Sequence, residues 1–213
     1  MGRQRGVQAD WTALADAWRS RYRPSMDAVR TGSLPWMNLD ALHRRSLDEV
    51  LAELGITEFG QADREELARS WHRLDPWPDA RPGLLALARR FTLATLSNGS
   101  VALLTNLVKR ADLPFDCILS AELFRAYKPD PAIYRGAAQL LGLPTGSCMM
   151  VAAHEDDLRA AAAEGMSTAL VVRPREWGAS GHHDEATRSQ ADVLATDLEE
   201  LARKLEALRP PEQ

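Results

Sequence analysis

The apolar residues of this chain change their spacing once, and that change restricts the fold more than any other feature. Before residue 75 they recur three or four positions apart, as Trp11, Leu14, Trp18 and Tyr22 do, which is the spacing of one helix face. After residue 90 short apolar runs alternate with amphipathic segments. A helical part followed by alternating strands and helices predicts an α/β fold, with a doubly wound, mainly parallel sheet beside a helical cap.

A proline-rich segment separates the two patterns. Residues 75–82 contain three prolines, which favours a stiff, non-helical connector. We therefore expect a helical cap domain at residues 1–80 and an α/β core domain at residues 81–213. Within the cap, Pro24 is expected to interrupt or end the first helix.

The core strands are expected to be short. They are the apolar runs at residues 91–96, 117–119, 148–152, 168–172 and 191–194, with a polar loop at residues 174–190. Two helices between them carry terminal signals. Asp130 is expected to cap a helix that begins at Pro131, and Gly165 to end the helix before the fourth strand.

The composition is that of an ordinary soluble globular protein. The 213 residues carry 26 Lys and Arg against 30 Asp and Glu, and this mild imbalance gives no electrostatic reason to expect nucleic acid or an acidic membrane as a partner. No apolar run approaches the roughly 20 residues of a membrane helix, and no apolar signal core follows the basic start. We therefore expect a cytoplasmic protein in which Cys117 and Cys148 are reduced.

Polar residues gather where strands end and helices begin, which is where α/β sheets form their sites. Ser97 and Asn98 follow a strand and open a helix, so their donors suit a carboxylate, a phosphate or a halide. A plain Asn-Gly turn with a capping serine is the alternative. Lys128 precedes Pro129, which restricts its freedom, so its ammonium group could neutralise carboxylates that would otherwise repel each other. The alternative is an ordinary lysine on the solvated surface.

A second group follows the next strand. Asp156 and Asp157 open a helix, where they favour the helix dipole or position a water, a lysine or a metal ion. Tyr134 alone suggests packing with a local partner for its hydroxyl. His154 is a weak candidate for a metal ligand because no second histidine stands at ligand spacing, and the histidines at positions 43 and 72 are expected to pack.

Together these stretches resemble the haloacid dehalogenase superfamily, specifically its type II (L-2-haloacid) branch. The most specific part is Leu96-Ser97-Asn98-Gly99 followed by Lys128-Pro129-Asp130-Pro131 and Tyr134, and the likeness covers nearly the whole chain. It implies a HAD-like, Rossmann-type core with a helical cap. It also implies a hydrolase that cleaves the carbon–halogen bond of a short (S)-2-haloacid through an aspartyl ester, without a metal or another cofactor.

The resemblance also implies roles for individual residues. Ser97 and Asn98 would hold the substrate carboxylate and help to receive the halide. Lys128 would stabilise the nucleophilic carboxylate, and Asp157 would orient Lys128 and help to activate the hydrolytic water. Tyr134 would line the substrate pocket.

This chain departs from the family pattern twice. Ala152-Ala153-His154 stands where well-known members have Ser-Ser-Asn, so His154 would supply the hydrogen bonds of the asparagine and the substrate range is open. The first motif, an apolar strand that ends in the nucleophilic aspartate, has no counterpart. Asp10 precedes the first helix and Asp16 lies inside it, so neither fits the nucleophile's place.

The missing motif has a structural consequence. In the family that strand lies between the strand that precedes Ser97-Asn98 and the strand that precedes His154, so its removal leaves two interior edges without partners. We therefore expect an interrupted sheet, no activity from the chain as written, and a natural start upstream of Met1.

Two other functions stay open. One is a magnesium-dependent phosphatase of the same superfamily with Asp156 or Asp157 as the metal ligand, although the sequence Ser97-Asn98-Gly99 argues against it. The other is a non-catalytic remnant or binding protein. The expected partner is a small haloacid, and exposed cap tryptophans such as Trp36 would allow a homodimer.

Overall fold

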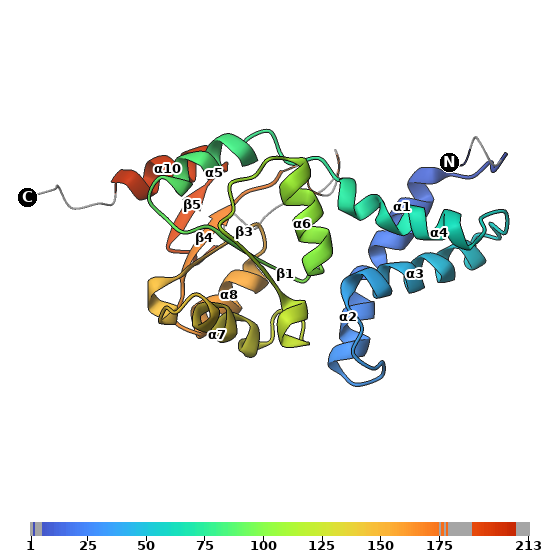
Figure 1. The fold of residues 1–213 in the computed structure, drawn as a ribbon, viewed down its shortest axis with the longest axis horizontal. Helices are drawn as coiled ribbons and strands as arrows, with labels where there is room; N and C mark the ends of the chain where they lie inside the picture. Colours follow the sequence, from blue (N-terminus) through green and yellow to red (C-terminus); the bar gives the residue numbers. More distant parts are fainter. Residues whose placement is uncertain (1, 3–5, 175, 177, 179–188, 208–213) are drawn as a thin grey trace, which may run out of the picture. The chain divides into compact units, whose positions relative to one another are not determined.

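The computed structural model (Figure 1) describes residues 2, 6–174, 176, 178 and 189–207. By its contacts the chain divides into two compact units. The first comprises Met1–Leu74, Ser97–Leu107 and Ser120–Tyr127, and the second comprises Asp75–Leu96, Val108–Leu119 and Lys128–Gln213. The expected division at residue 80 stays a prediction, and part of the expected loop at 174–190 lies outside the described residues.

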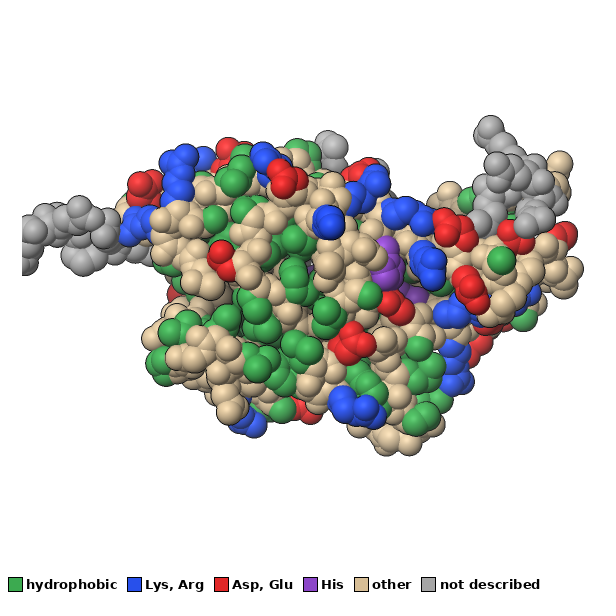
Figure 2. All heavy atoms as spheres, viewed as in Figure 1, with side chains coloured by type: hydrophobic (Ala, Val, Ile, Leu, Met, Phe, Trp, Pro, Cys, Tyr) green, Lys and Arg blue, Asp and Glu red, His purple; other side chains and the backbone are tan. Residues whose placement is uncertain are grey.

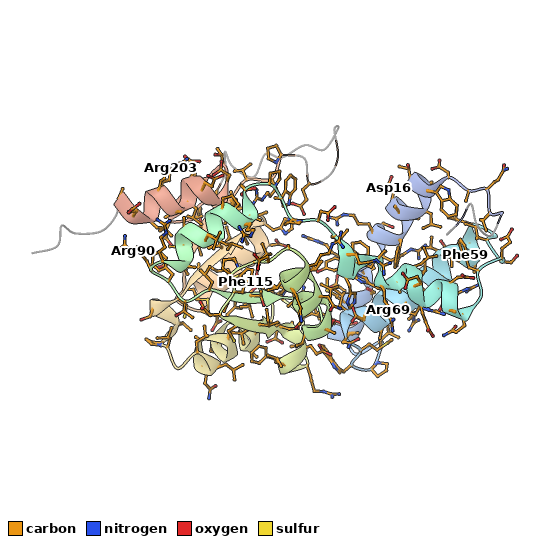
Figure 3. All side chains as sticks on the ribbon, turned by 45° about the horizontal axis from the view of Figure 1, so that its top comes forward. Asp16, Phe59, Arg69, Arg90, Phe115 and Arg203 are labelled. Carbon is orange, nitrogen blue, oxygen red and sulfur yellow. The ribbon has the colours of Figure 1, made fainter. Side chains whose placement is uncertain are left out.

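The first unit is helical and is organised around its longest helix. Its helices are α1 (Trp11–Ser20), α2 (Tyr22–Arg30), α3 (Leu39–Glu53), α4 (Gln61–Ala68), the 3₁₀ helices η2 (Arg69–Arg73) and η3 (Ala121–Phe124), and the first two turns of α6 (Val101–Arg110). Helix α3 contacts α1, α2 and α4. The apolar core between them includes Trp18, Leu47, Leu51 and Phe59, the last of which is labelled in Figure 3.

Two helix ends of this unit differ from the expectations. Pro24 does not end a helix. The helical run is interrupted earlier, at Arg21, and Pro24 is the third residue of the next helix, α2. Proline is tolerated there because the first N–H groups of a helix have no partner within the helix. Leu67, Trp71 and Leu74 also have the spacing of one helix face, but they do not form one helix, since α4 ends at Ala68 and the chain continues as the tighter η2.

The second unit contains the parallel sheet that the alternating pattern predicts. Strands β3 (Met149–Ala152), β4 (Ser167–Val171) and β5 (Val193–Ala195) form a sheet in that order, and both pairings are parallel. Met149 pairs with Ser167 and Ala169 pairs with Val193, which sets the register. Four consecutive residues of β4, from 168 to 171, are buried, as expected for a strand covered on both faces.

The other two strands form a separate sheet. Strand β1 (Ala94–Ser97) pairs with β2 (Cys117–Ser120), and within the described residues the strands fall into these two sheets. The Thr95 hydroxyl donates to the Leu119 carbonyl at 2.9 Å and accepts from the Leu119 amide at 3.0 Å. Strand β1, which ends at Ser97, and strand β3, which precedes His154, are therefore not hydrogen-bonded to each other. The sequence predicted this interruption of the sheet. The described residues before β1 form no strand.

Helices cover both faces of the three-stranded sheet (Figure 1). Helices α5 (Ala80–Ala88) and α10 (Leu198–Ala207) lie on one side, and α7 (Pro131–Leu140) and α8 (Glu155–Ala163) lie on the other. The 3₁₀ helix η4 (Thr145–Ser147) precedes β3. Asp130 caps α7 and Gly165 adopts a left-handed conformation after α8, as expected. Figure 3 labels Arg203 on α10 and Arg90 just after α5.

The proline-rich connector is shorter than expected because α5 begins at Ala80, with Pro82 in its first turn. It is held by an ion pair rather than by proline stiffness alone. Both guanidinium nitrogens of Arg173 donate to Asp79 at 2.8 and 2.9 Å, and Asp79 also accepts from the Leu198 amide at 2.9 Å.

The surface carries mixed charge. On the face drawn in Figure 2, Lys and Arg side chains alternate with Asp and Glu. In the described part of the chain no helix has the length and apolar character needed to span a membrane. Cys117 and Cys148 are free. Trp36, expected to be exposed, is instead half-buried against Tyr127 at 5.1 Å between ring centres, because the loop that carries it folds onto the α2–α3 core.

Candidate active site

Three of the predicted site residues meet in the second unit. Lys128 Nζ lies 2.9 Å from Asp157 Oδ2, and the Tyr134 hydroxyl donates to Asp157 Oδ1 at 2.6 Å. Both oxygens of the Asp157 carboxylate are thereby engaged by donors. The side chains of Lys128 and Asp157 are only 10% and 18% exposed, so this is a largely buried ion pair at the carboxyl end of β3. The surface lysine alternative is therefore excluded.

Burial governs the ionisation of this group. Desolvation lowers the pKa of Lys128 below its ordinary value, and the charge and hydrogen bond of Asp157 partly offset this effect. Desolvation, together with the bond to Asp157, raises the pKa of Tyr134, which therefore stays a hydroxyl donor. Tyr134 is fully buried in the apolar cluster with Met150 and Leu158. It orients Asp157 from inside the core.

His154 precedes α8 and has a partner that the sequence did not reveal. Its Nε2 lies 2.9 and 3.0 Å from the two carboxylate oxygens of Glu176. Asp157 is the third residue of the same helix, so His154 and Asp157 both stand at the first turn of α8. Glu176 lies 22 positions away, which explains why local motifs did not indicate the pair.

Ser97 and Asn98 belong to the first unit, where they form a tight loop before α6. The Gly99 amide donates to Ser97 Oγ at 3.1 Å, and the buried Ser120 hydroxyl donates to the Gly99 carbonyl. A Cβ at Gly99 would lie 3.2 Å from the Leu103 side chain and 3.4 Å from Ser97 Oγ. The glycine therefore allows the loop to fold back without displacing the serine hydroxyl.

Two carboxylates hold the start of α6, and sequence reasoning missed both. Ser100 caps the helix by accepting from the Leu103 amide at 3.0 Å, and its hydroxyl donates to Asp40 Oδ2 at 2.7 Å. The Val101 amide donates to Glu122 Oε2 at 2.8 Å. Asp40 and Glu122 lie 60 and 21 positions from their partners, so no local spacing predicted these contacts.

The two early histidines behave differently from each other. His43 is buried and stacks on Trp71 at 4.6 Å between ring centres, as expected for packing. His72 does more than pack, since its Nε2 lies 3.1 Å from Asp40 Oδ1 and its Nδ1 lies 2.9 Å from Asn106 Nδ2. The reason is its position on η2, beside the start of α3 and the middle of α6.

The early aspartates have local roles. Asp10 caps α1 by accepting from the amides of Thr12 and Ala13 at 3.0 and 2.9 Å. Asp16 is exposed on α1, where Figure 3 labels it. Among the described residues no group of three His, Cys, Asp or Glu side chains is arranged to hold a metal ion.

Comparisons with known proteins identify the family of the chain. The family model of the haloacid dehalogenase-like hydrolases matches residues 3–165. A solved structure of the defluorinating L-2-haloacid dehalogenase Rha0230 is similar to this chain with a TM-score of 0.92 and 44% identity, covering 96% of this chain and 84% of that one.

Two curated relatives represent different activities. The (S)-2-haloacid dehalogenase of Xanthobacter autotrophicus is 33% identical over 61% of this chain, and the match spans about half, 51%, of that relative. Phosphatase MT3486 of Mycobacterium tuberculosis (strain CDC 1551 / Oshkosh) is 34% identical over 77% of this chain and 81% of its own length. Similarity alone therefore leaves two chemistries to compare.

Proposed function

The chain belongs to the haloacid dehalogenase-like hydrolase family, and we propose that it hydrolyses the carbon–halogen bond of a short (S)-2-haloacid. The observation that carries this proposal is the buried Lys128–Asp157 pair, with Tyr134 on the second carboxylate oxygen. A buried ammonium stabilises a carboxylate nucleophile and needs no metal to do so. The relatives named dehalogenases support the choice of substrate.

In the proposed reaction a carboxylate oxygen of the enzyme attacks C2 of the haloacid. The C–halogen bond breaks with inversion, the halide leaves with its electron pair, and an ester forms. Water then attacks the ester carbonyl carbon, which releases the 2-hydroxyacid and restores the carboxylate. The proton of the water passes to a base, for which Asp157 and His154 are the available groups at the start of α8.

The substrate carboxylate needs donors of its own. In our proposal the Ser97 hydroxyl and the Asn98 amide bind it and help to receive the halide. The described residues hold no aspartate at the end of a strand before the cap, so locating the nucleophile is part of the test. We also propose a small-molecule substrate as the partner, no cofactor, and the cytoplasm as the compartment. A homodimer stays a prediction.

A magnesium-dependent phosphatase is the second candidate, and the relative named phosphatase favours it. The two functions differ in what they release and in what they require. Halide release from (S)-2-chloropropionate is measured in the presence of a chelator, and phosphate release from a phosphomonoester is measured with added magnesium.

The assays use the chain as given and a version extended through the upstream reading frame. We expect the extended version to release halide without magnesium, the chain as given to release none, and Lys128→Met in the extended version to abolish the release. Lys109→Met, on the exposed end of α6, is the matched control and should retain activity. Phosphate release that requires magnesium, with no halide release from either version, would contradict the proposal.

A further inference from the structure

We propose that Asp40 and Glu122 make the loop of Ser97 and Asn98 selective for singly charged anions over phosphate dianions. This inference rests on the proposed function in one respect, namely that the loop holds the substrate carboxylate. It assigns a specificity role to two residues outside the motifs. All of the groups involved belong to the first unit.

The start of α6 is already occupied by groups of the protein. Among its first three N–H groups, that of Val101 donates to Glu122 and that of Leu103 donates to Ser100. Ser100 in turn donates its hydroxyl hydrogen to Asp40. Two carboxylates thus lie at the first turn of α6, where an unoccupied helix end would favour a multiply charged anion.

The Glu122 carboxylate accepts hydrogen bonds from two donors. Its Oε2 accepts from Val101, and its Oε1 accepts from Asn38 Nδ2 at 2.8 Å. The Asn38 amide cannot turn around without loss, because its Oδ1 accepts from the Ala41 amide at 3.1 Å as the cap of α3. Each donor uses a different oxygen of Glu122, so a glutamine in its place, whose amide nitrogen cannot accept, would lose one of the two hydrogen bonds.

Asp40 is held by a side chain at each of its carboxylate oxygens. Its Oδ1 faces His72 Nε2, while Asn106 Nδ2, which can only donate, faces His72 Nδ1. In this arrangement His72 Nε2 carries the hydrogen that is donated to Asp40. His72 therefore orients Asp40 through a hydrogen bond.

The consequence is electrostatic selection at the loop. Each carboxylate repels a bound anion in proportion to the anion's charge, so a phosphate dianion is penalised twice as much as a carboxylate. Across a distance of about one helical turn in partly exposed surroundings, removal of one such charge should improve dianion binding relative to monoanion binding roughly fivefold to tenfold. The haloacid, its hydroxyacid product and the halide are all singly charged.

The test compares inorganic phosphate with propionate. Both are titrated at about pH 8 and constant ionic strength, because salt screens the effect. Binding is followed by the amide NMR signals of Gly99 and Ala102 in the wild type, Asp40→Asn, Glu122→Gln and the double variant. Asp27→Asn is the control, because Asp27 is an exposed carboxylate that pairs with Arg30 on α2.

We expect the ratio of the phosphate to the propionate dissociation constant to fall roughly fivefold to tenfold in each single variant and further in the double variant, and to stay constant in the control. Asp40→Asn keeps the test decisive if Glu122→Gln unfolds. If the dissociation constants of phosphate and propionate changed by the same factor, the two residues would have only a structural role, and the proposal would be overturned. Signals that respond to neither anion in any variant would overturn it as well.

The outcome is separable from that of the proposed function. A falling ratio in a protein that releases no halide would uphold the selectivity and reject the reaction. Halide release together with an unchanged ratio of dissociation constants would uphold the reaction and reject the selectivity.

Discussion

The sharpest stability prediction concerns His43, whose imidazole ring is buried in the first unit. Its side chain stacks on Trp71, and the residue is 5% exposed. In the described part of the chain neither ring nitrogen has a hydrogen-bond partner. Burial lowers the pKa of His43 from 6.5 to about 4, an effect that Asp40 opposes and His72 reinforces.

The sign and size of the effect follow from this shift. Because the folded pKa lies below the unfolded one, the unfolded chain binds the proton more readily between pH 4 and 6.5. The contribution to stability is complete above pH 6.5 and is lost as the pH falls through this window. The loss amounts to about 2 kcal/mol at pH 5 and about 3 kcal/mol at pH 4.

The assay is urea unfolding followed by tryptophan fluorescence at about pH 7.5, 6 and 5. Carboxylates also titrate toward the acid end, so the informative quantity is the difference between wild type and His43→Leu. The variant removes two unpaired buried nitrogens, and we expect it to lose about 2 kcal/mol less than the wild type between neutral pH and pH 5. Ser46→Ala, a buried change without a titratable group on the same helix, should lower stability equally at every pH. An unchanged pH dependence in His43→Leu would refute the reasoning.

Two further predictions concern the second unit. Gly83→Ala should lower the free energy of unfolding by about 1–3 kcal/mol in urea titrations, because its Cβ would clash with the Leu198 side chain and backbone; equal stability would show that α5 and α10 can separate freely. Asp157→Asn should lower the pKa of Lys128 further, since the aspartate raises it, and should cost about 3 kcal/mol of stability at neutral pH. NMR titration of the lysine side chain and urea unfolding measure the two effects, and an unchanged or higher lysine pKa would contradict the assignment.

Local signals predicted much of the fold. The strands at β3 and β4 and the caps at Asp130 and Gly165 follow from neighbouring residues, and the structure has them near the expected places. Pro24 was misjudged because proline ends a helix only when it falls in the interior, and a break at Arg21 placed it in a first turn. No feature of the sequence near Arg21 signals that break.

The candidate site shows the same limit. The contact of Lys128 with Asp157 was expected from the family resemblance, which implies that Asp157 orients Lys128. Glu176, Asp40 and Glu122 were not, because each reaches its partner through the tertiary fold. An exposed acidic residue and one that receives a buried hydrogen bond look alike in a single sequence.

The most direct test of the proposed chemistry is one turnover of (S)-2-chloropropionate by the extended version in oxygen-18 water, followed by mass spectrometry of the digested protein and of the product. The account predicts that oxygen-18 enters a carboxylate of the protein while the first hydroxyacid formed carries none, since water attacks the ester carbonyl. The labelled peptide would also identify the nucleophile. Label in the first product and none in the protein would contradict the ester mechanism, and the absence of halide release would contradict the dehalogenase assignment itself.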